Sequence, residues 1–146
     1  MICRSCDSTN LSSILDLGVQ PWCNDFISED KVGKENIYPL NLMHCDDCGL
    51  LQLSHTVAKE TMFGDHAYLS GMTTTLINHF YEVASENVEQ FNIKRDDLVV
   101  DIGGNDGSQL QQYRKAGIDN VLNIECAKRV SEVSRKNGIR TITEFF

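Results

Sequence analysis

The chain contains little proline or tryptophan and no long apolar run. Its 146 residues include two prolines and one tryptophan. No apolar stretch approaches the roughly 20 residues that a membrane-spanning helix needs. The N-terminus also lacks the apolar core of a signal peptide. From these absences we expect a soluble, cytoplasmic protein with no membrane partner.

Clusters of lysine and arginine are missing as well. The 13 basic residues are outnumbered by 21 acidic residues, which gives a formal net charge of −8. Because an acidic chain without a basic patch repels phosphate backbones, we expect no nucleic-acid partner. The 41% hydrophobic content is enough for a packed core, and the length predicts one ordinary domain or a small module with part of another.

Four of the six cysteines form two Cys-x-x-Cys pairs, Cys3 with Cys6 and Cys45 with Cys48. In a reducing compartment such pairs indicate metal ligands before disulfides. Four thiolates complete a tetrahedral zinc shell, so we expect a structural zinc without catalytic chemistry. Unliganded thiols or a redox pair are the alternatives. A redox pair is expected near a βαβ pattern, and neither pair lies in one.

The residues that flank these pairs refine the prediction. Gly49 and Asp7 follow the second and first pair, and both residue types tolerate a positive φ. His44 and Asp46 adjoin the ligands, but four cysteines already fill the shell. We expect the two remaining cysteines to be small buried hydrophobic residues; they are Cys23 and Cys126.

A strand, a glycine-rich turn and a helix follow one another near residue 100. The apolar run 98–102 is typical of a strand in a covered parallel sheet. An Asn-Asp-Gly sequence alone would also suit a hairpin. Residues 108–116 instead have helical composition and begin with the pattern Ser108-x-x-Gln111, which predicts a capping box. This arrangement is typical of a nucleotide-binding loop.

The glycine spacing of this loop indicates which nucleotide it binds. Gly103, Gly104 and Gly107 do not fit the Gly-x-Gly-x-x-Gly pattern of dinucleotide sites, which disfavours a nicotinamide-dependent dehydrogenase. They fit the spacing acid-x-Gly-x-small-x-Gly, in which Asp101 is the acid and Asn105 the small residue. That spacing suits a nucleoside with a short amino-acid tail, and we therefore expect S-adenosylmethionine as the cofactor.

An acid also ends the next predicted strand, residues 121–124. Glu125 at that place would accept hydrogen bonds from both ribose hydroxyls of a nucleoside. A solvated strand end is the alternative interpretation of this residue. The apolar and polar pattern further predicts a hairpin of 38–43 with 51–53, a short helix over 56–62, and a long amphipathic helix over 73–92. A helix over 128–136 and a strand over 139–142 complete the prediction.

Together these elements predict an α/β chain in three parts. A zinc-binding, β-rich domain covers residues 1–55, a connector with a linker helix covers 56–96, and the first βαβαβ half of a Rossmann-like domain covers 97–146. The first strand of such a sheet is normally central, because a fourth strand pairs on its other side. The sequence predicts no such fourth strand, so we expect the first strand to be an exposed edge. An exposed apolar edge favours self-association or a partner. We expect the chain to be a truncated or split enzyme.

A series of ordered motifs is shared with one known family. They are Cys3-x-x-Cys6, Leu17-Gly18 with Pro21, Tyr38-Pro39-Leu40, Cys45-x-x-Cys48-Gly49-Leu50, Gln52-Leu53, residues 65–71, residues 101–107, Gly138-Ile139 and Phe145-Phe146. In these the chain resembles the N-terminal part of the zinc-containing, S-adenosylmethionine-dependent C-methyltransferases of nucleotide-linked 4-keto deoxysugars. Three positions depart from the family pattern, namely His66, Gly71 and Met72.

The resemblance implies a class I methyltransferase domain that binds S-adenosylmethionine, with a structural zinc beside it. Gly103, Asn105 and Gly107 would line the methionine part of the cofactor, and Glu125 would bind its ribose. Tyr68 matches a tyrosine near the active site of the family. The implied reaction is proton abstraction beside a ketone, followed by methylation of the enolate, with a base from later in the family's chain. We expect this chain alone to be inactive. A zinc-binding interaction module that retains part of a nucleotide fold is the alternative.

Overall fold

The computed structural model describes residues 1–23, 26–64 and 67–146 of the chain. The motif positions Asp65 and His66 lie outside the described residues. Contacts divide the chain into two compact units, Met1–Ala58 and Lys59–Phe146, and each is described by itself. In the described part of the chain, no helix has the length and apolar character needed to cross a membrane.

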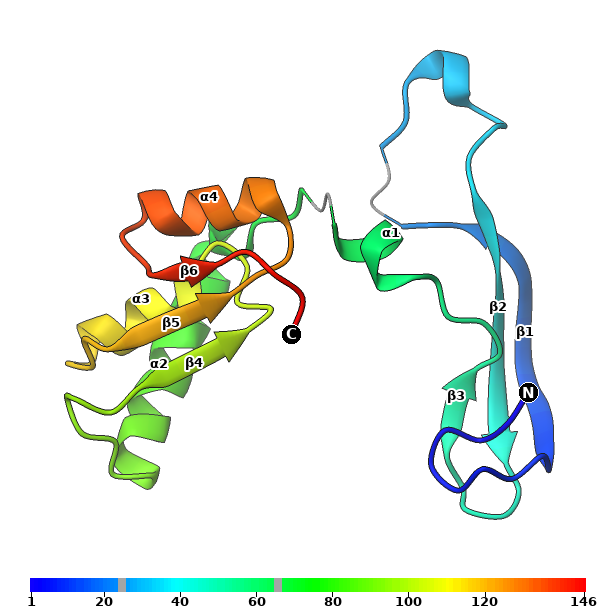
Figure 1. Ribbon diagram of the computed structural model, residues 1–146, viewed down its shortest axis with the longest axis horizontal. Coiled ribbons are helices and arrows are strands. Elements are labelled where there is room, and N and C mark those ends of the chain that lie inside the picture. Colours follow the sequence, from blue (N-terminus) through cyan, green and yellow to red (C-terminus); the bar gives the residue numbers. More distant parts are fainter. Residues whose placement is uncertain (24–25, 65–66) are drawn as a thin grey trace. The chain divides into compact units, whose positions relative to one another are not determined.

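The first unit is a three-stranded antiparallel sheet in the order β1-β2-β3 (Figure 1). Its strands are β1 (Leu11–Pro21), β2 (Ile37–Cys45) and β3 (Leu51–Leu53), and a 3₁₀ turn covers Glu29–Lys31. The predicted hairpin of β2 with β3 is confirmed. Strand β1 was not predicted. Most of its residues are exposed, and register shifts interrupt its pairing with β2. Apolar and polar residues alternate only over residues 15–20, which is about half of the strand.

This first unit has almost no hydrophobic core. Within its described residues, only Cys3, Cys45 and Gln52 are buried. The Gln52 amide holds the N-terminal segment, since its Oε1 accepts from the Arg4 N–H (2.9 Å) and its Nε2 donates to the Ile2 carbonyl (3.1 Å). A module of this size without an apolar core needs another source of stability, such as a bound metal ion.

The second unit contains a parallel sheet and its helices (Figure 1). Its elements are α1 (Lys59–Phe63), a 3₁₀ turn (Ser70–Met72), α2 (Thr74–Gln90), β4 (Val99–Ile102), α3 (Ser108–Lys115), β5 (Val121–Ile124), α4 (Lys128–Lys136) and β6 (Thr141–Ile142). The strands are parallel in the order β4-β5-β6. This alternation of strands and helices is a partial Rossmann-like fold, as the sequence predicts.

The core of the second unit lies between α2, α3 and one face of the sheet. Ala84 of α2, Leu110 and Tyr113 of α3, and Val121 of β5 are buried together. The Asn87 side chain donates to the hydroxyl of Tyr113 (2.7 Å), which joins α2 to α3. Two large apolar side chains of this segment do not join the core. Tyr81 of α2 is 48% exposed, and Phe91, which follows the helix as its C-cap, is 66% exposed.

The opposite face of the sheet is open. Strand β4 lies at the edge of the sheet, and its residues Val100 and Ile102 are 42% and 54% exposed. They are paired with Leu122 and Ile124 of β5, which are half-buried. The prediction of an exposed edge strand is confirmed. Parallel sheets are usually covered on both faces, so this apolar face is unusual.

Helix α3 begins differently from the sequence prediction. Gly107, with φ of 76°, is the N-cap, and Ser108 is already helical. The Asp106 carboxylate accepts the Ser108 N–H instead (3.1 Å). The predicted capping box is therefore wrong, because an acid two residues upstream satisfies the helix start that Ser108 was expected to cap.

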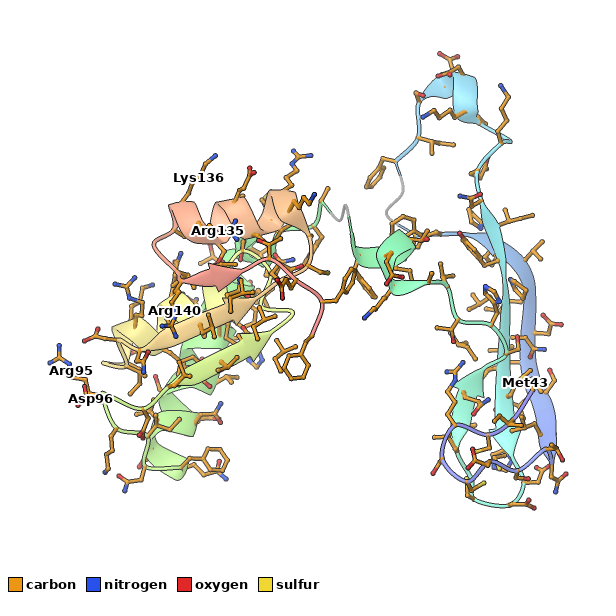
Figure 2. The ribbon with its side chains drawn as sticks, in the orientation of Figure 1. Met43, Arg95, Asp96, Arg135, Lys136 and Arg140 are labelled. Atoms are coloured by element: carbon orange, nitrogen blue, oxygen red, sulfur yellow. The ribbon has the colours of Figure 1, made fainter. Side chains whose placement is uncertain are left out.

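The end of α4 is tied to β6 by a basic side chain. Arg135 donates to the carbonyl of Thr141 (3.2 Å) and to the hydroxyl of Thr143. Figure 2 shows Arg135 and Lys136 on α4. Basic side chains in the last turn also complement the negative end of the helix dipole. These contacts hold β6 and the residues after it against the end of α4.

Candidate metal and cofactor sites

The four predicted ligand cysteines lie together in the first unit. The sulfur atoms of Cys3, Cys6, Cys45 and Cys48 are all within 4.8 Å of one another. The Sγ–Sγ distance is 3.6 Å both from Cys3 to Cys48 and from Cys6 to Cys45. Zinc–sulfur bonds of about 2.3 Å at tetrahedral angles place sulfurs about 3.8 Å apart. The cluster therefore fits a zinc ion, and the separations are far longer than a disulfide bond of about 2.05 Å.

Each pair is folded by a residue with positive φ. Asp7 has φ of 58° and Gly49 has φ of 78°, as predicted. The Asp7 N–H donates to the Cys3 carbonyl (3.1 Å), and the Gly49 N–H donates to the Cys45 carbonyl (2.8 Å). The two turns are thus built in the same way. Both pairs present their sulfurs to one point because of this shared geometry.

The local backbone also favours a thiolate at Cys3. The N–H groups of Cys6 and Ser5 point to the Cys3 sulfur and lower the pKa of its thiol to about 6. The Ser5 nitrogen lies 3.4 Å from that sulfur. A hydrogen bond from the Ser8 backbone lowers the pKa of the Cys6 thiol, but the neighbouring cysteine thiols, with Cys48 foremost, and burial raise it to about 12. Thiolates are the form that binds metals, so zinc binding must release protons from this cluster.

The other candidates near the cysteines have different roles. His44 and Asp46 pair with each other (Nδ1 to Oδ1, 2.9 Å), and Asp46 also accepts from the Ser12 hydroxyl (3.2 Å), so neither joins the metal cluster.

The prediction that Cys23 and Cys126 are buried is wrong, since Cys23 is exposed and Cys126 is half-buried. Burial was inferred from residue type alone, which does not determine position.

The glycine-rich loop joins β4 to α3 through three residues with positive φ. These are Gly103 (74°), Asn105 (52°) and Gly107 (76°). A Cβ on Gly103 would meet nothing within 4 Å, so the backbone there is open to a ligand. A Cβ on Gly107 would lie 2.7 Å from the Ser134 hydroxyl. Gly107 is buried against α4 and lines neither of the hollows described below.

Glu125 lies where the predicted ribose ligand was expected, directly after β5. Only 7% of its surface is exposed. Its Oε2 accepts the Asn105 N–H (3.0 Å) and its Oε1 accepts the Ala127 N–H (2.8 Å). The carboxylate therefore joins the glycine loop to the start of α4. Oε1 also accepts a weak hydrogen bond from the Cys126 thiol (3.6 Å). Oε2 still has a lone pair, so the group can accept a further hydrogen bond from a ligand.

Asp101 and Asn123 lie beneath the loop. Burial, followed by the nearby Glu125 charge, raises the pKa of the Asp101 carboxyl. Asn123 is completely buried and donates to the Asn105 carbonyl (2.8 Å) and the Ser134 hydroxyl (2.9 Å). A Cβ on Gly104 would lie 2.6 Å from Asn123 Oδ1 and 2.8 Å from Asp101 Oδ2. This crowding explains the second glycine of the loop.

A connector segment lies against the same loop. We call residues 68–71 the strap. The Asn105 side chain donates to the Tyr68 carbonyl (2.9 Å) and accepts the Ser70 N–H (2.9 Å). The Asp106 Oδ2 accepts the Gly71 N–H (2.8 Å). Sequence reasoning placed Tyr68 near the site but missed Asp106, which was considered only as part of a turn.

Two hollows adjoin the loop, and both are lined in part by Gly103 and Asn105. The larger is a cleft of about 460 Å³ whose walls are mostly apolar, with Glu125 as an acid among Phe63, Ile102, Ile124, Phe145 and other residues. The smaller, about 180 Å³, is lined by Ser70, Phe80, Asp101, Gly103, Gly104, Asn105 and Gln109. Glu144 and Lys59 also line the cleft. A mostly apolar cleft with a few polar groups suits a nucleoside, and a small polar hollow suits an amino-acid group. The residues therefore fit S-adenosylmethionine.

Comparisons with known proteins support zinc binding and a similarity to methyltransferases. Residues 3–63 match a family model described as "Putative zinc binding domain", and this range includes all four cluster cysteines. Over 145 residues, 99% of this chain, the sequence is 28% identical to the C-methyltransferase NovU of Streptomyces niveus. The chain resembles the N-terminal part of a C-methyltransferase. It spans 34% of the length of that relative.

The two candidate sites lie in different parts of the sequence. The matched zinc-binding range ends at Phe63, the last residue of α1, before the glycine loop. The similarity to the C-methyltransferase extends over both. The loop, the strap and Glu125 all belong to the second unit, so these candidate residues lie within one compact part of the chain.

Proposed function

We propose that this chain is the zinc-binding and cofactor-binding part of an S-adenosylmethionine-dependent C-methyltransferase that acts on a nucleotide-linked 4-keto deoxysugar. The observation that carries the proposal is the open Gly103–Asn105 backbone with the buried Glu125 carboxylate beside it. In this proposal residues 1–55 bind zinc, 56–96 connect and 97–146 bind the cofactor. The similarity to a C-methyltransferase supports the reaction type.

Each cofactor-binding residue has a proposed task. Glu125 would accept the ribose hydroxyls, and its fixed carboxylate already faces the apolar cleft. Asp101, Gly103 and Asn105 would surround the amino-acid end, since all three line the polar hollow. Gly107 would act indirectly, by letting α3 and α4 approach behind the loop. The cofactor supplies an electrophilic methyl group on a sulfonium.

The proposed chemistry needs a carbon nucleophile. A proton leaves the carbon beside the sugar ketone, and the enolate oxygen must be stabilised while the carbon is methylated. Tyr68 is our candidate catalytic residue, because Asn105 holds its backbone at the glycine loop. The chain spans a third of the relative, and we propose that the base lies outside the matched residues. The zinc would be structural, since four cysteines fill its shell.

Calorimetry with S-adenosylhomocysteine tests the proposal. We expect weak, single-site binding to the zinc-loaded chain, loss of most of that binding in Glu125→Gln, and no methyl transfer. Glu132→Gln, an exposed acid of α4, is the matched control. Absence of binding in the unaltered chain would refute the cofactor function. Tight binding or turnover would refute the expectation that the chain acts only as part of an enzyme.

One observation favours a second candidate, a zinc-dependent interaction module. Strand β1 exposes several large apolar side chains, each more than half exposed, which are Ile14, Leu15, Leu17 and Val19. Exposed apolar groups of this size often mark a protein-binding surface. Ultraviolet crosslinking with labelled S-adenosylmethionine separates the two candidates, because a pure interaction module would not be labelled.

A further inference from the structure

The strap makes three hydrogen bonds to the glycine loop that the proposed cofactor contacts leave unexplained. Two of them use the Asn105 side chain and one uses Asp106. Asn105 also donates its own N–H to Glu125, so one residue connects the strap with the proposed ribose ligand. The strap is therefore joined to the side chains that would bind the cofactor.

Asp106 is the unusual member of this set. It is only 4% exposed, yet it carries a carboxylate. Its two oxygens accept different backbone N–H groups: Oδ1 that of Ser108 at the start of α3, and Oδ2 that of Gly71 in the strap. Its own carbonyl accepts from the Asn137 side chain (3.1 Å). A buried acid in such a position is tolerated only when both oxygens are satisfied.

Gly71 is shaped to fit this acid. A Cβ at that position would lie 2.5 Å from the Ser108 hydroxyl and 2.9 Å from Asp106 Oδ2. The close approach thus requires glycine. Ser70, the preceding residue, lines the small polar hollow together with Asp101 and Gln109. Asp106 consequently holds a segment that forms one wall of the proposed amino-acid pocket.

We propose that Asp106 is a positioning residue that keeps the strap closed on the glycine loop, so that Ser70 completes the wall of the cofactor hollow. This inference rests on the proposed function for the identity of the ligand. Asp106 touches neither hollow itself, since it lines neither the cleft nor the small pocket. Its effect on binding is therefore transmitted through the strap and through the first turn of α3.

The proposal predicts linked changes in the order of the strap and in affinity. Asp106→Asn keeps the size of the side chain but has one carbonyl oxygen in place of two carboxylate oxygens, so one N–H loses its partner. Loss of a hydrogen bond to a charged group corresponds to about a 10-fold change or more. We expect hydrogen exchange of the Ser70 and Gly71 amides to accelerate about 10-fold, and S-adenosylhomocysteine affinity to fall by a similar factor.

The experiment compares the full chain with three variants, Asp106→Asn, Asp106→Ala and Asp97→Asn. Asp97 is the matched control, because its carboxylate also accepts a backbone N–H, that of Lys94 (2.8 Å), away from the strap. Exchange is followed by mass spectrometry for the peptide that contains the strap and for β5. Calorimetry with S-adenosylhomocysteine gives the affinity, and thermal unfolding shows that each variant is folded.

The outcomes separate this inference from the proposed function. Faster exchange in the strap alone with lower affinity, graded from Asn to Ala, supports it. Normal exchange in the strap, or faster exchange with affinity kept within twofold, overturns it. If the unaltered chain binds no S-adenosylhomocysteine, the proposed function fails, and the exchange data still decide whether Asp106 holds the strap. A uniform rise in exchange that includes β5 would show a purely structural role and would also overturn the inference.

Discussion

At the scale of single residues, Gly103 and Gly107 differ in surroundings although their backbones are alike. Their φ angles are 74° and 76°. A methyl group on Gly103 would meet open space, whereas on Gly107 it would also lie 2.9 Å from Ile139. Alanine at Gly103 would therefore carry only the energetic penalty of a positive φ, whereas alanine at Gly107 would carry that penalty and a steric clash as well.

We predict that Gly107→Ala destabilises the second unit more than Gly103→Ala. Both should lose about 1–2 kcal/mol from the unfavourable backbone conformation, and Gly107→Ala about 1–3 kcal/mol more from overpacking. Urea unfolding followed by circular dichroism measures the difference. Equal losses would mean that α4 moves aside freely, contrary to the tight contact with Ser134.

Single residues could be predicted from the sequence where a residue type has one strongly preferred chemical role. Four cysteines in two close pairs imply a common ion, and the structure gathers their sulfurs. Glu125 was expected from its place after a strand, but not its hydrogen bonds to two backbone N–H groups. Those partners come from Asn105 and Ala127, and only the folded turn brings Asn105 to the carboxylate.

At the scale of elements, the β1-β2-β3 sheet depends on its metal cluster. Its described residues bury almost nothing apolar besides two of the cysteines. The binding free energy of a structural zinc, about 10–16 kcal/mol in small peptides, can replace a missing core. We predict that a chelator unfolds residues 1–58 and leaves the parallel sheet intact. In backbone amide NMR spectra, the peaks of the first unit should lose their chemical-shift dispersion, and the peaks of the second unit should not change.

Cysteine substitutions provide the controls for this prediction. Cys45→Ser should lower the zinc content from one ion per chain to nearly none, as measured by plasma mass spectrometry. Cys23→Ser, at an exposed thiol outside the cluster, should retain the ion. A first unit that stays folded without metal would contradict the dependence of this sheet on zinc.

Elements were predictable where their pattern of burial is regular. The parallel strands and helices of the second unit have apolar residues at regular spacing, and the predicted order agrees with the structure. Strand β1 is mostly exposed and is interrupted by register shifts, and its apolar residues have a regular spacing only over residues 15–20. The start of α3 was misread because Asp106 caps it from within the turn. Both failures concern features that depend on neighbours distant in sequence or on exact turn geometry.

At the scale of the whole molecule, the open face of the parallel sheet is the largest departure from an ordinary α/β protein. Leu98, Val100 and Ile102 are between 42% and 54% exposed. Such an edge strand, apolar on its free side, favours association with another chain. We predict concentration-dependent self-association of the isolated protein, measured by analytical ultracentrifugation.

A charge on this face should reverse the association. Val100→Lys should shift the protein toward the monomer by about 10-fold or more in dissociation constant, because a buried lysine without a partner is costly. Tyr81→Lys, which changes a 48% exposed side chain of α2, should not. A protein that is monomeric at all concentrations, or one that Tyr81→Lys dissociates equally well, would contradict the role of this face.

The Glu125 carboxylate has a consequence for the entropy of ligand binding. Freezing a glutamate side chain costs about 1.5–2 kcal/mol in rotamer freedom. Here two backbone N–H groups and nearly complete burial immobilise the side chain during folding itself. A hydroxyl-bearing ligand that docks on this carboxylate does not have to order it. That difference corresponds to roughly a 10-fold gain in affinity over the same contact made by a mobile glutamate.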